Sequence, residues 1–151
     1  MDYTVPFLKW LIKCPDISKN KLFFNAVTAN KETKAIITQQ VQKSEDVEYI
    51  DGSIQHTVRF TLFDYKSIEF NQLVKSKIEN NENVSALLET GNLNSWIEQQ
   101  NKAQFFPDYG SRFEVQEIRP EYLTPSTPSI DTKAMIAKYS IPITMVVIEY
   151  A

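Results

Sequence analysis

His56 and Cys14 are the two side chains best suited to catalysis, because imidazole and thiol groups serve as bases and nucleophiles near neutral pH. Each is the only residue of its type in the 151-residue chain. His56 lies inside a strand pattern, and the sequence near it holds no set of metal ligands or triad partners. Cys14 lies on the apolar face of a predicted helix, where a free cysteine usually packs in the core. We therefore interpret His56 as a structural or surface residue and Cys14 as a structural one.

Acidic residues in the connector over residues 44–52 also have a possible chemical role: Glu45, Asp46, Glu48 and Asp51. Their spacing does not fit a calcium-binding EF-hand loop, which needs alternating oxygen ligands, a central glycine and a terminal glutamate. Two interpretations stay open, a solvated loop or a contact with a partner protein. The three glycines of the chain are too far apart for a phosphate-binding loop. No pattern predicts a cofactor or a metal.

Aromatic residues in the predicted strands suit either nucleic-acid stacking or the core. A stacking surface needs basic residues between the rings, and here only Arg59 and Lys66 are near. The formal net charge of −3 also argues against a basic nucleic-acid-binding surface. Packing in the core is therefore the favoured interpretation for Phe23, Phe24, Phe60, Phe63 and Tyr65.

Length and composition indicate one globular domain over residues 1–151. Hydrophobic residues make up 42% of the chain, which is sufficient for a core that needs no metal or disulfide. A single cysteine excludes an intrachain disulfide and fits a reducing compartment. The apolar run within residues 1–15 is interrupted by lysines and is too short to span a bilayer, so we expect synthesis in the cytoplasm without a membrane step.

The first half of the chain predicts one helix and three strands. The helix covers residues 5–14, with Thr4 as its N-cap and its apolar residues on one face. Two strands follow over residues 21–28 and 34–43, joined by a polar turn. A long strand over residues 53–66 alternates apolar and polar residues, which predicts one buried and one solvent-exposed face.

The second half predicts one helix and two strands. The helix covers residues 84–104 and is expected to be interrupted near Gly91. The strands cover residues 112–119 and 133–150. Pro142 lacks the backbone N–H of a regular strand residue, so the last strand is expected to be an edge strand or to be bulged there.

Together these elements predict an α+β fold, with a mostly antiparallel sheet of four to five strands and two main helices packed on one face. The apolar positions of the helices and strands supply the expected core. Its principal members are Phe7, Trp10, Leu11, Phe60, Leu62, Trp96, Ile97, Tyr139 and Ile141.

The order of these elements resembles the tail terminator and minor capsid proteins of tailed phages and prophages of Gram-positive bacteria. A helix ending near a Cys-Pro pair leads into a strand pair, and a long strand follows at residues 52–62. Three short motifs then match in order: W-I-E-x-Q-N at residues 96–101, V-Q-x-I at 115–118 and A-x-Y-x-I at 137–141. The resemblance covers most of the chain and depends on the order and spacing of the motifs.

This resemblance implies a structural, non-enzymatic virion protein of the tail or neck region, made in the cytoplasm of the host bacterium. A tail terminator forms a ring, expected here to have six copies, that caps the tail tube, stops its polymerisation and joins it to the head connector. The implied partners are other copies of the chain, the major tail tube protein and a head–tail connector or stopper protein. Phage DNA would pass through the ring without sequence-specific binding, which the negative net charge suits, because a basic lining would hold phosphates.

Two alternatives are weighed against the terminator. One is a head–tail joining stopper or completion protein, or a minor capsid protein, at the neck. The other is a small enzyme such as a nuclease or an acyl-transfer enzyme, which is disfavoured because the chain is poor in the His, Cys and Gly residues that such sites use.

In a ring, we expect three regions of the chain to contact neighbouring proteins. The acidic connector and a Pro/Ser/Thr-rich loop over residues 123–132 are expected to make axial contacts, and polar residues of the long strand and the second helix to make lateral ones. The polar end of that helix has a second interpretation, as a helix cap. The expected interface residues are Glu45, Asp46, Glu48, Tyr49, Asp51, Arg59, Lys66, Glu98, Gln100, Asn101, Pro125 and Asp131.

Overall fold

The computed structural model describes residues 2–15, 21–24, 33–41, 46–67, 82–122, 128–133 and 135–151, with the backbone alone over 21–24, 33–41, 65–67 and 82–90. The predicted strand ends at residues 25–28 and 42–43 lie outside the described residues. The same holds for Glu45, Pro125 and the side chain of Lys66.

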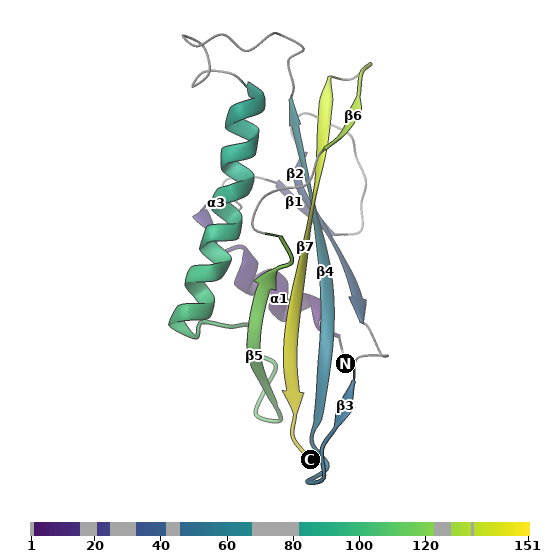
Figure 1. Ribbon diagram of the computed structural model, residues 1–151, viewed down its shortest axis with the longest axis vertical. Helices are drawn as coiled ribbons and strands as arrows, with labels where there is room; N and C mark the ends of the chain where they lie inside the picture. Colours follow the sequence, from purple (N-terminus) through teal and green to yellow (C-terminus); the bar gives the residue numbers. More distant parts are fainter. Residues whose placement is uncertain are drawn as a thin grey trace.

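One sheet forms the centre of the fold, and the helices α1 and α3 lie beside it (Figure 1). Five strands follow the order β1-β2-β4-β7-β5, while β3 pairs with β4 and β6 pairs with β7 outside this path. The fold is therefore α+β with a mostly antiparallel sheet, as predicted. In chain order the elements are α1 (Thr4–Leu11), β1 (Lys21–Phe24), β2 (Thr33–Val41), β3 (Val47–Glu48), β4 (Ile54–Ser67), α3 (Glu82–Ala103), β5 (Phe113–Pro120), β6 (Ser129–Asp131) and β7 (Ile136–Glu149).

β1 and β2 differ from the expected turn-linked pair. They run parallel to each other, with Phe23 opposite Ile36, whereas strands joined by a tight turn pair antiparallel. Two short strands also arise within segments that were predicted as connector or loop. β3 lies in the acidic connector and pairs with the start of β4, and β6 lies in the Pro/Ser/Thr-rich loop and pairs with β7.

β4 and β7 form the longest ladder of the sheet, from Ile54 opposite Glu149 to Ser67 opposite Ile136, without a shift in register. Residues directly opposite each other lie on the same face of a sheet. One face, which we call the helix-side face, therefore carries three buried pairs: Val58 with Met145, Phe60 with Ile143, and Leu62 with Ile141. The other, which we call the outer face, carries Arg59 with Thr144, Thr61 with Pro142, and Phe63 with Ser140.

Pro142 lies in a central strand, so the predicted edge position is wrong. Its register with Thr61 continues unbroken, and β7 has no bulge against β4 at this point. The Pro142 carbonyl accepts a hydrogen bond from the Glu121 N–H at 3.0 Å, which shows that the proline nitrogen faces the side of β5. The ladder with β5 ends just before this point, at Pro120 opposite Ile143. A central strand tolerates this proline because no β5 carbonyl requires its missing N–H.

α1 begins at Thr4 and ends at Leu11, and a tighter turn then leads to Cys14. The predicted Thr4 cap is wrong. Tyr3 occupies the N-cap position without a side-chain hydrogen bond, and the Asp2 carboxylate instead accepts the Thr4 N–H at 2.9 Å. An acidic side chain before the helix thus satisfies one of its free N–H groups.

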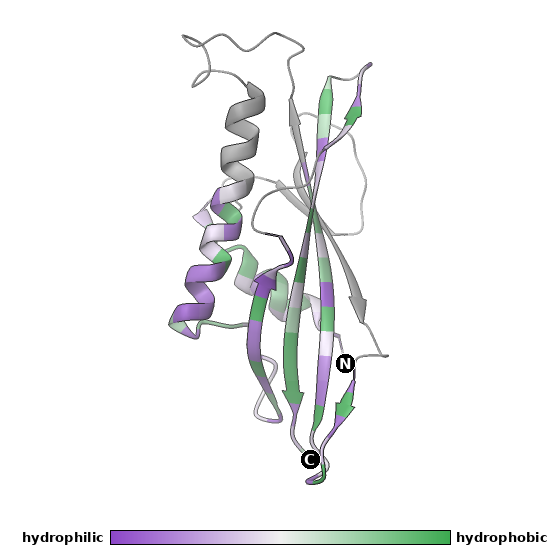
Figure 2. Ribbon diagram, viewed as in Figure 1, coloured by the Kyte–Doolittle hydropathy of each residue, from purple (hydrophilic) through white to green (hydrophobic). Residues whose placement is uncertain are grey.

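α3 is continuous, contrary to the interruption predicted near Gly91. The helical hydrogen bonds override the weak helix preference of one glycine, a penalty of about 1 kcal/mol relative to alanine. The part of α3 beyond Gly91 is largely hydrophilic, whereas β7 is hydrophobic along much of its length (Figure 2). The contrast matches burial, because every residue of β7 is buried or partly buried, whereas α3 beyond Gly91 has several exposed positions.

Side chains of α1 and α3 belong to the same buried cluster as those of the helix-side face. Phe7 of α1 stacks on Phe60 with 3.8 Å between ring centroids, and Trp10 meets Trp96 of α3 at 4.8 Å. Every predicted core residue is buried except Trp96, which is partly buried against this cluster. Tyr139 is buried in a second, smaller cluster beside Ala137.

Candidate contact surfaces

The turn between β3 and β4 forms a braced hairpin at one end of the molecule, and we call residues 46–53 the acidic tip (Figure 1). The Tyr49 N–H donates to the Ser53 carbonyl at 2.8 Å, and the Gly52 N–H donates to the Tyr49 carbonyl at 3.0 Å. The Tyr49 hydroxyl also donates to the Gln55 side chain at 3.0 Å. The acidic tip is therefore a hairpin held in place by backbone and side-chain hydrogen bonds.

Apolar side chains are exposed on the acidic tip. Ile50 is fully exposed, and Val47 and Tyr49 are each nearly half exposed. Tyr150 is exposed at the same end of the molecule, next to the C-terminus. Contiguous exposed apolar side chains framed by charges are typical of contact surfaces. The exposed carboxylates around them are the predicted residues Asp46, Glu48 and Asp51.

Asp51 remains negatively charged because the turn stabilises its charged form. Its carboxylate accepts hydrogen bonds from the Ser53 hydroxyl at 2.5 Å and from the Ser53 N–H at 2.9 Å. Both hydrogen bonds lower the pKa of Asp51 below its ordinary value, with the hydroxyl as the larger cause. The same hydrogen bonds stabilise the turn, so protonation of the Asp51 carboxylate would also weaken the turn.

His56 joins the acidic tip to the last strand. Its Nδ1 lies 3.2 Å from Asp46 Oδ2, and its Nε2 lies 2.7 Å from Glu149 Oε2. Both ring nitrogens therefore face carboxylates, whereas in a catalytic triad one of them faces the nucleophile. The sequence did not predict this cluster, since Glu149 lies 93 residues from His56 and only the β4–β7 register brings them together.

Tyr3 covers the same cluster from the start of α1, with its ring centroid 6.4 Å from that of His56. Burial, followed by the nearby charges of Glu149 and Asp46, raises the pKa of the Tyr3 hydroxyl above its ordinary value. Tyr109 packs edge-on against Tyr3 and donates its hydroxyl to the Tyr3 carbonyl at 2.8 Å. These contacts secure the N-terminal segment against the base of the acidic tip.

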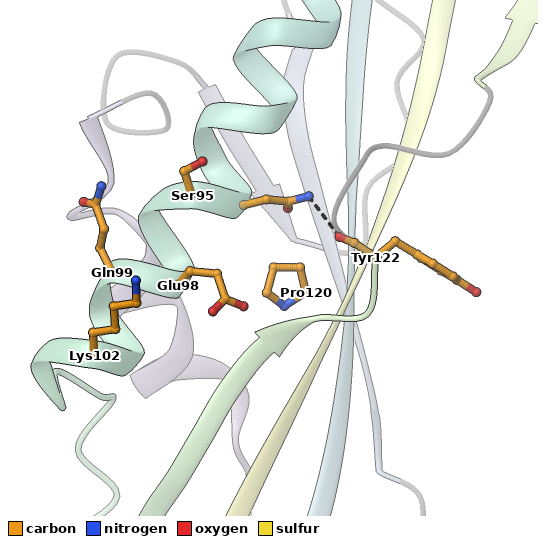
Figure 3. Close-up of a pocket in the computed structure, with 7 residues that line it drawn as sticks. Ser95, Glu98, Gln99, Lys102, Pro120 and Tyr122 are labelled. Atoms are coloured by element: carbon orange, nitrogen blue, oxygen red, sulfur yellow. Dashed lines mark hydrogen bonds between the residues drawn. The ribbon is translucent and has the colours of Figure 1, made fainter.

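A pocket of about 310 Å³ lies between α3 and the end of β5 (Figure 3). Asn94 is 7% exposed and donates its side-chain N–H to the Tyr122 carbonyl at 3.3 Å, but its Oδ1 has no hydrogen-bond partner among the described residues. Glu98 extends towards Pro120 across the pocket (Figure 3). Most of the residues that line the pocket have polar or charged side chains, and the full set is Asn94, Ser95, Glu98, Gln99, Lys102, Pro120 and Tyr122.

Only one of the three predicted interface residues at the end of α3 lines this pocket. Glu98 does so, and its carboxylate accepts from Arg119 at 3.1 Å. Gln100 is partly buried. The interface position predicted for Asn101 is wrong, because its side chain is buried and hydrogen-bonds the backbone of Ile118. A residue held inside the subunit in this way is not available to a neighbouring subunit.

Arg59 lies on the outer face and already has a partner within the chain. Its guanidinium donates to Glu121 at 2.7 Å, and Glu121 also accepts from the Thr144 hydroxyl at 3.0 Å. Asp131 is exposed, and its carboxylate accepts the Lys133 N–H at 3.0 Å. The predicted interface residues thus lie on separate surfaces, and the acidic tip is where several of them come together.

No group of three or more His, Cys, Asp and Glu side chains is arranged to hold a metal ion within the part of the chain that the structure describes. In the same part, no helix combines the length and the apolar character needed to cross a membrane. The chain matches no protein-family model and no curated protein. The functional interpretation therefore depends on the contact surfaces and on the motif order of the sequence.

Proposed function

We propose that this chain is a structural virion protein of a tailed phage, a tail terminator that assembles into a ring of six copies. The ring would cap the tail tube, stop its polymerisation and join it to the head connector. The protein would be made in the cytoplasm of the host bacterium and would act in the tail or neck region through contacts rather than catalysis. The motif order of the sequence is the first support for this proposal.

The exposed apolar side chains of the acidic tip carry the proposal. Isolated exposed apolar residues are common on any protein surface. Here Val47, Tyr49 and Ile50 lie within four consecutive residues of one hairpin, which is braced by hydrogen bonds. Removing such side chains from water contributes about 25 cal/mol for each Å² buried. A tip built in this way supports a role in protein–protein contact.

The charge of the acidic tip also fits a protein that surrounds DNA without holding it. Carboxylates repel phosphates, whereas binding of DNA requires basic side chains that release counterions. In the proposed ring, a tip facing a neighbouring protein or the channel would leave DNA free to slide.

Electron microscopy of the purified protein with the major tail tube protein of the same phage tests this function. We expect rings at one end of each tube and tubes of limited length. Tubes that elongate without limit and never bind the chain at their ends would contradict the terminator. Rings with a symmetry other than sixfold, or rings bound to the head connector but not to tubes, would instead favour the stopper or completion protein.

A further inference from the structure

α1 has a second, solvent-facing surface that its role in the core does not explain. Val5 and Ile12 are 51% and 49% exposed, and Lys9 and Lys13 are exposed beside them. The spacing of four, three and one residues places all four side chains on the side of the helix opposite Phe7. We call these four residues the basic α1 face.

Phe105 is a further exposed apolar side chain near α1. It follows the end of α3, is 60% exposed, and its carbonyl accepts the Trp10 Nε1–H at 2.8 Å, which places it next to α1. Among the described residues, neither Lys9 nor Lys13 has an ion-pair partner. Asp2, the acidic residue before α1, is already engaged with the Thr4 N–H. The basic α1 face therefore combines exposed lysines, which have no ion-pair partner in the described part of the chain, with exposed apolar side chains.

The acidic tip has the complementary composition, with exposed carboxylates around exposed apolar side chains. We propose that the acidic tip of one copy docks on the basic α1 face of the next copy. Glu48 and Asp51 would meet Lys9 and Lys13, and Ile50 would pack between Val5, Ile12 and Phe105. This inference names the contact between copies in the proposed ring. It rests on the proposed function, because only that function implies that the contacts close into a ring.

The positions of the two surfaces suit repeated contacts of this kind. The acidic tip lies at one end of the molecule, next to the C-terminus, whereas α1 lies behind the strands in the view of Figure 1. Each copy would therefore contact two neighbours, one through its acidic tip and the other through its basic α1 face. Contacts between two different surfaces produce closed rings when the rotation between neighbours closes, and open filaments when it does not. Two acidic tips would repel each other, and so would two basic α1 faces, because each pair has charges of the same sign. Pairing of a surface with its own copy is therefore disfavoured.

A helix with lysines and apolar side chains on one face also suits an anionic membrane surface. The acidic tip favours a second copy instead, because the same chain carries a surface of opposite charge with its own exposed apolar residues. Membrane binding is therefore the competing outcome of the experiment.

Sedimentation velocity of the full chain at increasing concentration, in low and in high salt, tests the inference. We expect self-association that weakens as salt is added, because exposed charge pairs are screened. Ile50→Ser and Lys9→Glu should each weaken association by about tenfold or more, as for anchor residues of an interface. Lys133→Glu makes the same charge change at an exposed position of neither surface and should leave association unchanged.

A charge exchange makes the test specific. Glu48→Lys alone should weaken association, and Glu48→Lys combined with Lys9→Glu should restore it, with far-ultraviolet circular dichroism unchanged throughout. A monomer at every concentration, or association that all these variants leave intact, would overturn the inference. So would binding of the chain to phosphatidylglycerol vesicles that Lys9→Glu abolishes while association is unaffected.

The two proposals fail separately. If the charge exchange restores association but no copy ever binds tail tubes, the interface is correct and the terminator function is wrong. If rings cap tubes and the Lys9 and Ile50 variants assemble normally, the terminator function survives and this interface is wrong.

Discussion

The side-chain amide of Asn101 hydrogen-bonds both backbone groups of Ile118. Its Oδ1 accepts the Ile118 N–H at 2.8 Å, and its Nδ2 donates to the Ile118 carbonyl. β5 is the last strand on its side of the path β1-β2-β4-β7-β5, so these groups point away from β7 towards the free edge. Asn101 thus takes the place that a further strand would occupy and blocks this part of the edge against unwanted strand pairing.

Asn101→Leu keeps the branched shape and the number of heavy atoms of the side chain but removes both hydrogen bonds. We expect a loss of about 2–3 kcal/mol in the free energy of unfolding, because two buried backbone groups lose their partners. Urea denaturation followed by circular dichroism measures this. Gln99→Leu, at an exposed position two residues earlier in α3, is the matched control and should change stability by less than about 0.5 kcal/mol. Equal effects of the two variants would contradict the role assigned to Asn101.

Phe60→Ala should destabilise the fold by about 3–5 kcal/mol, since Phe60 is fully buried and stacks on Phe7. Trp96→Ala should cost less, about 2 kcal/mol, because Trp96 is only partly buried and loses mainly its contact with Trp10. Thermal and urea unfolding of both variants give the comparison. A larger loss for Trp96→Ala would place the centre of the core between the helices rather than between α1 and the sheet.

The acidic tip should lose order in acid. The folded-state pKa of Asp51 is lowered from 3.8, mainly by the Ser53 hydroxyl and then by the Ser53 N–H, so its contribution to stability is present above pH 3.8 and is lost as the pH falls through the lower folded-state value. Amide hydrogen exchange at the tip should therefore speed up as the pH is lowered from about 5 to about 2, after correction for intrinsic rates. Asp51→Asn should remove this pH dependence; an unchanged profile would rule out Asp51 as its source.

Alanine substitutions at two glycines should have opposite effects. Gly52 has a φ of +86°, and a Cβ there would lie 3.2 Å from the Ala151 Cβ, so Gly52→Ala should cost about 1–2 kcal/mol. Gly91 is helical, and a Cβ there meets nothing within 4 Å, so Gly91→Ala should stabilise the protein by about 0.5–1 kcal/mol. Thermal unfolding of both variants checks the two signs. A loss of stability from Gly91→Ala would show that α3 does bend at this residue.

Apolar periodicity along the chain was sufficient to predict the main elements. The alternation over residues 53–66 predicted β4 within one residue at each end, and the helical spacing of Phe7, Trp10 and Leu11 predicted the buried face of α1. These features depend on residues only a few positions apart in the sequence, and apolar periodicity reports on that local range. The errors at Thr4 and Gly91 are also local, since both were inferred from residue preferences that hydrogen bonds at the helix start and along the helix outweigh.

Only the tertiary structure decided which side chains meet. His56 and Glu149 are neighbours because β4 and β7 pair over their whole length, and Asn101 is a core residue because α3 lies against the free edge of β5. Pro142 is tolerated in the central strand β7 because the β5 ladder ends beside it. The sequence thus determined which segments form strands and helices and which of their faces are apolar. The order and register of the strands, and with them the acidic tip and its anchor at His56, depend on pairing between residues far apart in the chain, for which local spacing carries no signal.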